Sequence, residues 1–261
     1  MNTLLWIQCG ACGGESMAIF GLDGPSERGQ DTLARFLENE RVRLLWHPSL
    51  SLESPRELGY IVESILCGRE KLTLFCVEGS IIHGPNGTGM FDTFHGKAKK
   101  DLIATLCSKA EYVLAMGTCA AFGGIPAAAP NPTEASGIQF TIGKPGGLLS
   151  PEWRSSAGFP VINLSGCPVD AVTMLTTMSS ILSGTLPALD VLNRPSTVRP
   201  CLSEGSCRKC GTAEKAGYSC YNCIGASFPI NKRLFRHSET RCIKTIPSVD
   251  KAHTFPSVVS V

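Results

Sequence analysis

The chain has 261 residues, of which 43% are hydrophobic and 18% are charged. This composition is typical of a globular protein with one large domain, or one domain and an appendage. A formal net charge of +2 gives no reason to expect nucleic acid or an anionic membrane as a partner. No apolar run reaches the roughly 18 residues of a transmembrane helix, so we expect no spanning segment.

Apolar runs alternate with helical patterns along the chain, and this order predicts an α/β fold with a parallel sheet. Strands are expected at residues 4–7, 42–46, 72–78, 112–116 and 159–164. Helices are expected at residues 15–21, 31–39, 55–66, 97–110 and 169–182. The strand at 72–78 is apolar nearly throughout, as in a sheet covered on both faces. The long glycine-rich loop at 79–96 suggests a functional or partner-facing role.

Thirteen cysteines are the unusual feature of the composition. Disulfide frameworks are typical of small secreted chains, whereas this chain is long and its cysteine count is odd. Its first residues also lack the basic stretch and the cleavage site of a signal peptide. We therefore expect thiolates that bind metal or a cluster in a reducing cytoplasm, with membrane association only through a partner.

Four of these cysteines follow predicted strands. Cys9 and Cys12 come after the first strand, Cys119 after the fourth and Cys167 after the fifth. Ligands of open α/β sheets bind outside the carboxyl ends of the strands, so the four thiols are expected to converge there. Four thiolates suit a 4Fe–4S cluster and equally suit tetrahedral zinc. A thioredoxin-like redox pair at the first two cysteines would leave the other two unexplained.

Two glutamates and three further cysteines could each have either a functional or an ordinary structural role. Glu15 and Glu78 lie next to the expected site. Each is able to tune a cluster or relay protons there, or simply to cap a helix or form an ion pair. Cys67, Cys76 and Cys107 fall within helix or strand runs, which predicts ordinary core packing for all three.

The composition changes beyond residue 186, which predicts a domain at 1–186, a linker at 187–200 and a cysteine-rich tail at 201–261. The tail carries seven candidate ligands: Cys201, Cys207, Cys210, Cys220, Cys223, His237 and Cys242. Seven ligands are enough for one four-ligand cluster and one three-cysteine 3Fe–4S cluster. Taken alone, the two Cys-x-x-Cys arms at 207–210 and 220–223 resemble a zinc ribbon.

The ordered set of motifs resembles the small subunit of nickel–iron hydrogenases over roughly residues 3–198. The set comprises Cys-x-x-Cys at 9–12, Val-Glu-Gly at 77–79, the segment 116–126 that begins Met-Gly-Thr-Cys, and Ser-Gly-Cys-Pro at 165–168. The segments 45–50 and 85–89 are similar to the cytoplasmic uptake and sensory branch of that family. The tail departs from the family pattern because it is short and has no histidine before its first cysteines.

The resemblance implies a flavodoxin-like domain that carries a proximal 4Fe–4S cluster on Cys9, Cys12, Cys119 and Cys167. It also implies a heterodimer with a large subunit that holds nickel and iron and splits hydrogen. Electrons would pass from the proximal cluster through further clusters in the tail to an acceptor protein or a quinone-linked partner. No catalytic residue is then expected on this chain. Ala11 and Gly124 stand where some oxygen-tolerant relatives have extra cysteines, which implies an ordinary four-cysteine cluster.

Three alternatives stay open at this point. A hydrogen-sensing regulatory subunit would have the same motifs and a different output. Related subunits of quinone reductases typically have adjacent cysteines in the first motif, whereas Gly10 and Ala11 separate the pair here. A zinc-stabilised interaction protein would contain neither iron nor acid-labile sulfide.

Overall fold

The computed structural model describes residues 1–20 and 33–196, and its centre is a parallel five-stranded sheet of order β11-β7-β3-β1-β2. The strands are β1 (Asn2–Gln8), β2 (Val42–Trp46), β3 (Leu72–Glu78), β7 (Ala110–Met116) and β11 (Ile162–Leu164). Renumbered in chain order, this is the flavodoxin-like arrangement 2-1-3-4-5. The predicted α/β class and parallel sheet are therefore confirmed. The order reverses between β1 and β3, where sheets of this type bind ligands.

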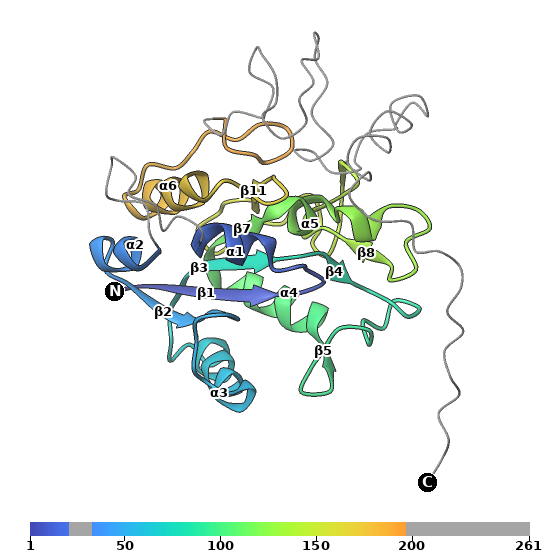
Figure 1. The fold of residues 1–261 in the computed structure, drawn as a ribbon, viewed down its shortest axis with the longest axis horizontal. Coiled ribbons are helices and arrows are strands. Elements are labelled where there is room, and N and C mark those ends of the chain that lie inside the picture. The colour runs from blue at the N-terminus through green and yellow to red at the C-terminus, as the bar shows by residue number, and fades with distance from the viewer. Residues whose placement is uncertain (21–32, 197–261) are drawn as a thin grey trace, which may run out of the picture.

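Helices cover both faces of the sheet (Figure 1). They are α1 (Gly14–Phe20), α2 (Leu33–Asn39), α3 (Pro55–Leu66), α4 (Lys99–Lys109), α5 (Gly117–Phe122) and α6 (Ala171–Leu182). One apolar core joins the sheet to α1, α2 and α6. The other core joins it to α3, α4 and α5. Because β3 is buried along its whole length, it needs apolar side chains at every position rather than at alternate ones.

Most predicted elements appear within a few residues of their expected bounds, and the differences have local causes. The helix α3 begins where expected because Ser54 caps it: its side chain accepts from the Glu57 backbone, and the Glu57 side chain accepts in return from the Ser54 backbone. The strand β11 is shorter than the predicted one, because pairing with β7 begins only at Ile162.

Short elements in the connections were not predicted. The loop at 79–96 contains β4 (Ile81–Ile82) and β5 (Thr93–Phe94), which pair with β8 (Ala135–Ser136) and β6 (Lys97–Ala98). A further pair is β9 (Phe140–Thr141) and β10 (Lys144–Pro145), and η1 (Ile125–Ala127) is a short 3-10 helix. Two-residue strands leave no periodicity to detect in a sequence, because they depend on a partner distant along the chain.

The three cysteines expected in the core divide into two groups. Cys76 on β3 and Cys107 on α4 are fully buried, as predicted. Cys67 is exposed, so the core prediction is wrong for this residue. It lies at the end of α3, where its backbone caps the helix and its side chain leaves the apolar stripe.

Part of the segment predicted as a linker packs on the sheet domain. The Asn163 side chain on β11 donates to the Leu192 carbonyl at 2.7 Å, and its backbone N–H donates to the Asn193 carbonyl at 2.8 Å. Within the described ranges, no helix has the length and apolar character to cross a bilayer.

Candidate functional site

Four strands of the sheet end side by side. In the register of the sheet Gln8 pairs with Glu78, Glu78 with Met116, and Met116 with Leu164. The turns that follow these residues therefore begin at one level along one edge. Strand pairing thus brings together segments that are more than 150 residues apart, and the expected cysteines lie in these segments.

The chain after β1 remains tied to the chain after β3. The Cys9 N–H donates to the Glu78 carbonyl at 2.8 Å, and Gly10 and Ser80 exchange backbone hydrogen bonds of 2.9 and 3.0 Å. The chain after β1 therefore stays paired with the chain after β3 as far as Gly10, and α1 begins only at Gly14. Cys12 therefore lies beyond the hydrogen-bonded part of the turn and is exposed.

A buried carboxylate at the end of β3 holds the start of α1. Glu78 accepts from Trp6 Nε1 at 2.9 Å, from the Ser16 hydroxyl at 2.6 Å, and from the backbone N–H groups of Glu15 and Ser16 at 3.2 and 3.3 Å. The N–H groups of a first helical turn lack intrahelical partners, so the carboxylate satisfies them and complements the helix dipole. Of the explanations open for Glu78, helix capping is the one that the contacts support.

The next turn of the site begins with a backbone conformation that requires glycine. Gly117 starts α5 with a φ of 87°, and this helix, which was not predicted, carries Cys119 in its first turn. The Thr118 N–H donates to the Gly166 carbonyl at 2.8 Å, and the Gly166 N–H donates to Thr118 Oγ1 at 3.2 Å. These two bonds fix the turn of Cys119 against the turn of Cys167.

Three of the four predicted ligands lie near one another, and the carboxylate of Glu15 lies with them. The three are Cys12, Cys119 and Cys167. Burial raises the pKa of Cys119 to about 11, a hydrogen bond from Ser80 opposes this, and the charges of Glu15, Cys167 and Cys12 raise it further. Those three groups therefore lie close enough to act on the Cys119 sulfur electrostatically. Such anionic ligands repel one another, and a positively charged metal centre among them would relieve the repulsion.

Two glycines let the backbone approach two of the sulfurs closely. A Cβ at Gly124 would lie 2.5 Å from Cys119 Sγ. A Cβ at Gly14 would lie 3.3 Å from Cys12 Sγ and 3.8 Å from the Cβ of Pro168, which follows Cys167. The soft sulfur donors, which lie against glycine backbone with no side chain between, fit an iron–sulfur cluster. Among the described residues, no three His, Cys, Asp or Glu side chains come close enough to hold a single metal ion.

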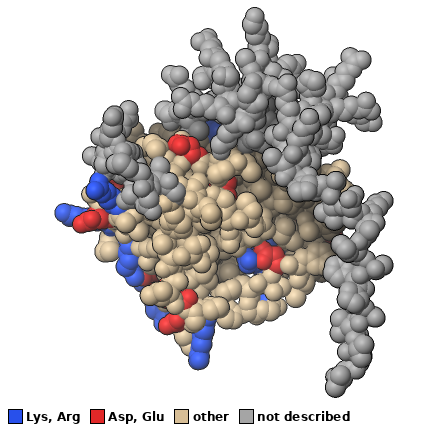
Figure 2. All heavy atoms as spheres, in the orientation of Figure 1, with Lys and Arg blue, Asp and Glu red and all other residues tan. Residues whose placement is uncertain are grey.

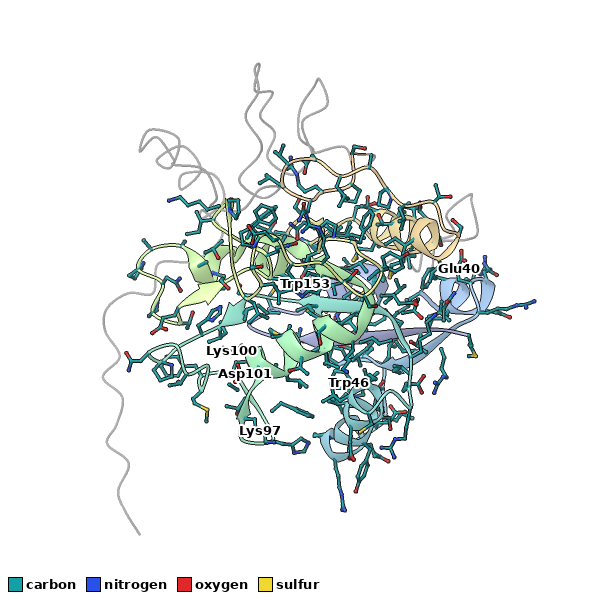
Figure 3. All side chains as sticks on the ribbon, turned by 180° about the vertical axis from the view of Figure 1, so that it is seen from behind. Glu40, Trp46, Lys97, Lys100, Asp101 and Trp153 are labelled. Carbon is teal, nitrogen blue, oxygen red and sulfur yellow. The ribbon has the colours of Figure 1, made fainter. Side chains whose placement is uncertain are left out.

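Cys9, the remaining predicted ligand, packs into the core on the face of the sheet opposite α1. Successive side chains of a strand alternate between faces, and Cys9 follows Leu5 and Ile7 toward the core beneath α4. Burial raises the pKa of Cys9 to about 12, while Lys99 of α4 lowers it. Figure 3 shows this side of the molecule, where α4 also carries Lys100 and Asp101. The structure thus does not bring Cys9 to the other three thiols.

A buried histidine packs behind the start of α1. The His47 ring lies 5.0 Å from the Trp6 ring and 5.2 Å from the Phe20 ring. The Ser49 N–H donates to His47 Nδ1 at 3.1 Å, so that nitrogen carries no proton. Burial lowers the His47 pKa to about 4, although the Glu78 charge opposes this shift.

The His47 environment predicts a specific pH dependence of stability. The unfolded chain binds a proton on this ring below about pH 6.5, whereas the folded chain does so only near pH 4. The free energy of unfolding should therefore fall by about 1.5 kcal/mol between pH 6.5 and pH 5 through this group. Urea unfolding of His47→Phe should lack this part of the pH dependence, and exposed His95→Phe should retain it. Equal slopes for the two variants would contradict the assignment.

The remaining predicted ligands, Cys201, Cys207, Cys210, Cys220, Cys223, His237 and Cys242, lie outside the described residues. Sequence reasoning placed Glu15 near the site but did not count it among the ligands. Two signals were available. Cys12 and Glu15 have the same three-residue spacing as Cys9 and Cys12, and the alternation along β1 directs Cys9 toward α4.

Comparison with known proteins agrees with the fold and with the motif order. Residues 12–181 match the family described as NADH ubiquinone oxidoreductase, 20 Kd subunit. The chain is 27% identical to the quinone-reactive Ni/Fe-hydrogenase small chain of Wolinella succinogenes, over 74% of this chain and 48% of that protein. It is 35% identical to the periplasmic NiFe hydrogenase small subunit 1 of Nitratidesulfovibrio vulgaris, over 46% of this chain and 33% of the relative.

Among solved structures, the fold is similar to the actinobacterial-type NiFe-hydrogenase from Ralstonia eutropha H16. The TM-score is 0.63 with 27% sequence identity, and the match covers 75% of this chain and 58% of that chain. The chain thus spans between a third and about half of the length of the two relatives named above. These matches favour the hydrogenase interpretation over a quinone-reductase subunit. The chain therefore belongs to the NADH ubiquinone oxidoreductase 20 Kd subunit family, and the relatives named here are hydrogenase small subunits and a NiFe-hydrogenase.

Proposed function

We propose that this chain is the electron-transfer small subunit of a nickel–iron hydrogenase and that an iron–sulfur cluster is bound at the strand ends. The observation that carries the proposal is the meeting of Cys12, Cys119 and Cys167 on turns fixed by the sheet register. The sequence predicted Cys9 as the fourth ligand of a 4Fe–4S cluster. That ligation stays a prediction, and the variants described below test it.

The chain's own residues would position and tune this group. A cluster of this type supplies reversible one-electron transfer. The Ser80 hydroxyl, which donates to the Gly123 carbonyl at 2.8 Å, lies near the Cys119 sulfur and lowers its pKa, which favours the thiolate form. Glu78 holds the first turn of α1, and the bonds between Thr118 and Gly166 hold the other two turns. Such pre-set ligands lower the reorganisation that accompanies binding of the cluster.

The exposed side of the site supports a protein partner. Cys12 and Cys167 are exposed. The apolar side chains of Met17 on α1 and Ile125 on η1 are 73% and 69% exposed. Figure 2 shows that uncharged atoms dominate the described part of one face, while Lys and Arg gather along one edge. Since a cluster here would be open to water in the isolated chain, we propose that the large subunit with nickel and iron covers it in a heterodimer.

The continuation of the electron path is proposed from the sequence. Electrons would leave the strand-end cluster for one or two further iron–sulfur clusters in the tail, with 3Fe–4S among the candidates. An acceptor protein or a quinone-linked partner would then take them. The hydrogen-sensing role and a zinc ribbon in the tail are the alternatives to this path. The domain at 1–186, the linker at 187–200 and the tail at 201–261 are the corresponding proposed division of the chain.

We propose a cytoplasmic location for the complex. In the described part of the chain, Cys9, Cys12, Cys67, Cys76, Cys107 and Cys119 are free thiols, as suits a reducing compartment. One relative is described as periplasmic, so the location has to be measured. Fractionation of cells that produce the tagged chain should place it with cytoplasmic markers.

Metal analysis of the natural complex tests the proposal. The tagged chain, purified anaerobically from its own cells, should contain iron and acid-labile sulfide in equal amounts and should co-purify with nickel. Nickel would report the presence of the large subunit, because this chain is expected to have no nickel site of its own. Zinc without iron would overturn the cluster assignment. Iron without nickel would contradict the hydrogenase partnership.

A further inference from the structure

We propose that Glu15 is the fourth protein ligand of the strand-end cluster, which would then be held by three thiolates and one carboxylate. This inference rests on the proposed function, because it presupposes a cluster on Cys12, Cys119 and Cys167. It changes the first ligand motif of the chain from the Cys-x-x-Cys at 9–12 to Cys-x-x-Glu at 12–15.

The Glu15 carboxylate lies at the start of the helix that carries Cys119. A Cβ at Gly117 would lie 2.1 Å from Glu15 Oε1 and 2.5 Å from its carboxyl carbon. Gly117 is two residues before Cys119 in α5. Glu15 is only 7% exposed. The carboxylate therefore extends inward to the α5 turn.

The backbone of Glu15 is held in this position from the opposite side. Its N–H donates to Glu78 Oε1 at 3.2 Å, and the next N–H, that of Ser16, donates to the same oxygen at 3.3 Å. With the main chain anchored on β3, the side chain is presented to the turns after β7 and β11. The electrostatic effect of Glu15, Cys167 and Cys12 on Cys119 agrees with this placement.

The cysteine that would otherwise complete the set is turned away. Cys9 packs against the core between the sheet and α4. The groups that act on it electrostatically are Lys99 and Asp92, and it acts in turn on buried Cys107. To reach the other ligands, Cys9 would have to leave the core beneath α4. Its backbone bond to Glu78 and the paired bonds between Gly10 and Ser80 oppose that movement.

A carboxylate ligand has distinct consequences for the cluster. Each ligand bond forms by donation of a lone pair to iron, so no electron is gained or lost when Glu15 binds. The oxygen ligand is harder than a thiolate, so one iron of the cluster becomes chemically different from the other three. That iron is held less firmly, and its removal would leave a 3Fe–4S cluster on the three cysteines.

Three variants of the full-length chain, each purified as the complex with its partner, test the ligand set. Glu15→Gln keeps the size of the side chain and removes the anionic oxygen. It should lose about one iron per chain as Fe²⁺ and, after one-electron oxidation with ferricyanide, show the electron paramagnetic resonance signal of an oxidised 3Fe–4S cluster. Glu15→Cys should keep the full iron content, and the distinct iron in the Mössbauer spectrum should become thiolate-like. Cys9→Ser is the matched control, and its iron content and both spectra should equal those of the natural protein.

Signals from clusters in the tail are common to all four proteins, so the differences report on this site alone. Full iron in Glu15→Gln together with loss of iron in Cys9→Ser would overturn the proposal and restore the four-cysteine set. A natural-protein Mössbauer spectrum that Glu15→Cys leaves unchanged would also overturn it. Absence of iron and sulfide from the natural protein would instead refute the proposed function on which the inference rests.

Discussion

Alanine in place of Glu78 is expected to lower the free energy of unfolding by about 3–5 kcal/mol and to reduce the iron content at the strand ends. The carboxylate is fully buried and accepts four hydrogen bonds, two from side chains and two from the backbone of α1. Its removal leaves buried donors without a partner, and each such donor costs about 1–3 kcal/mol. The first turn of α1, which presents Glu15, also loses its anchor.

Urea unfolding followed by circular dichroism measures the loss, and iron per chain measures the effect on the site. Glu63→Ala is the matched control, because Glu63 is exposed and its ion pair with Arg69 spans 3.8 Å. This control should change stability by less than about 0.5 kcal/mol. If Glu78→Ala loses less than about 1 kcal/mol, another contact holds the turn.

Serine in place of Cys119 is expected to abolish the paramagnetic signal of the strand-end cluster in the reduced protein. Serine has nearly the same volume as cysteine and retains a hydroxyl, so α5 and its bond to Gly166 should persist. A hydroxyl is a poor ligand for cluster iron at neutral pH, because it does not ionise as a thiol does. The ligand set thus loses the thiol on which Cys12, Cys167 and Glu15 all act electrostatically.

Electron paramagnetic resonance of the dithionite-reduced complex tests this expectation. Cys67→Ser is the control, since Cys67 is an exposed free thiol at the end of α3. Its spectrum should match that of the natural protein. A Cys119→Ser spectrum that also matches would refute the assignment of Cys119 as a ligand.

The main elements of the fold could be predicted because their signals are local. The fully apolar run of β3 and the capping box at Ser54 each occupy a few consecutive residues. The helix α5 was missed because six residues are too few to show a helical period, and its start depends on the backbone conformation of Gly117. Cys67 was misplaced because the end of α3 turns its side chain outward.

The sequence by itself determined the order of strands and helices, the family to which the chain belongs, and the position of cysteine-bearing turns after strands that end at one edge of the sheet. These follow from local patterns and from the rule that parallel strands end together. Only the tertiary structure decided which side chains face one another there. The alternation of β1 sends Cys9 to α4, while the bond from Glu78 to the start of α1 brings Glu15 to Gly117. Both outcomes depend on contacts between segments more than 60 residues apart, which a linear motif does not record.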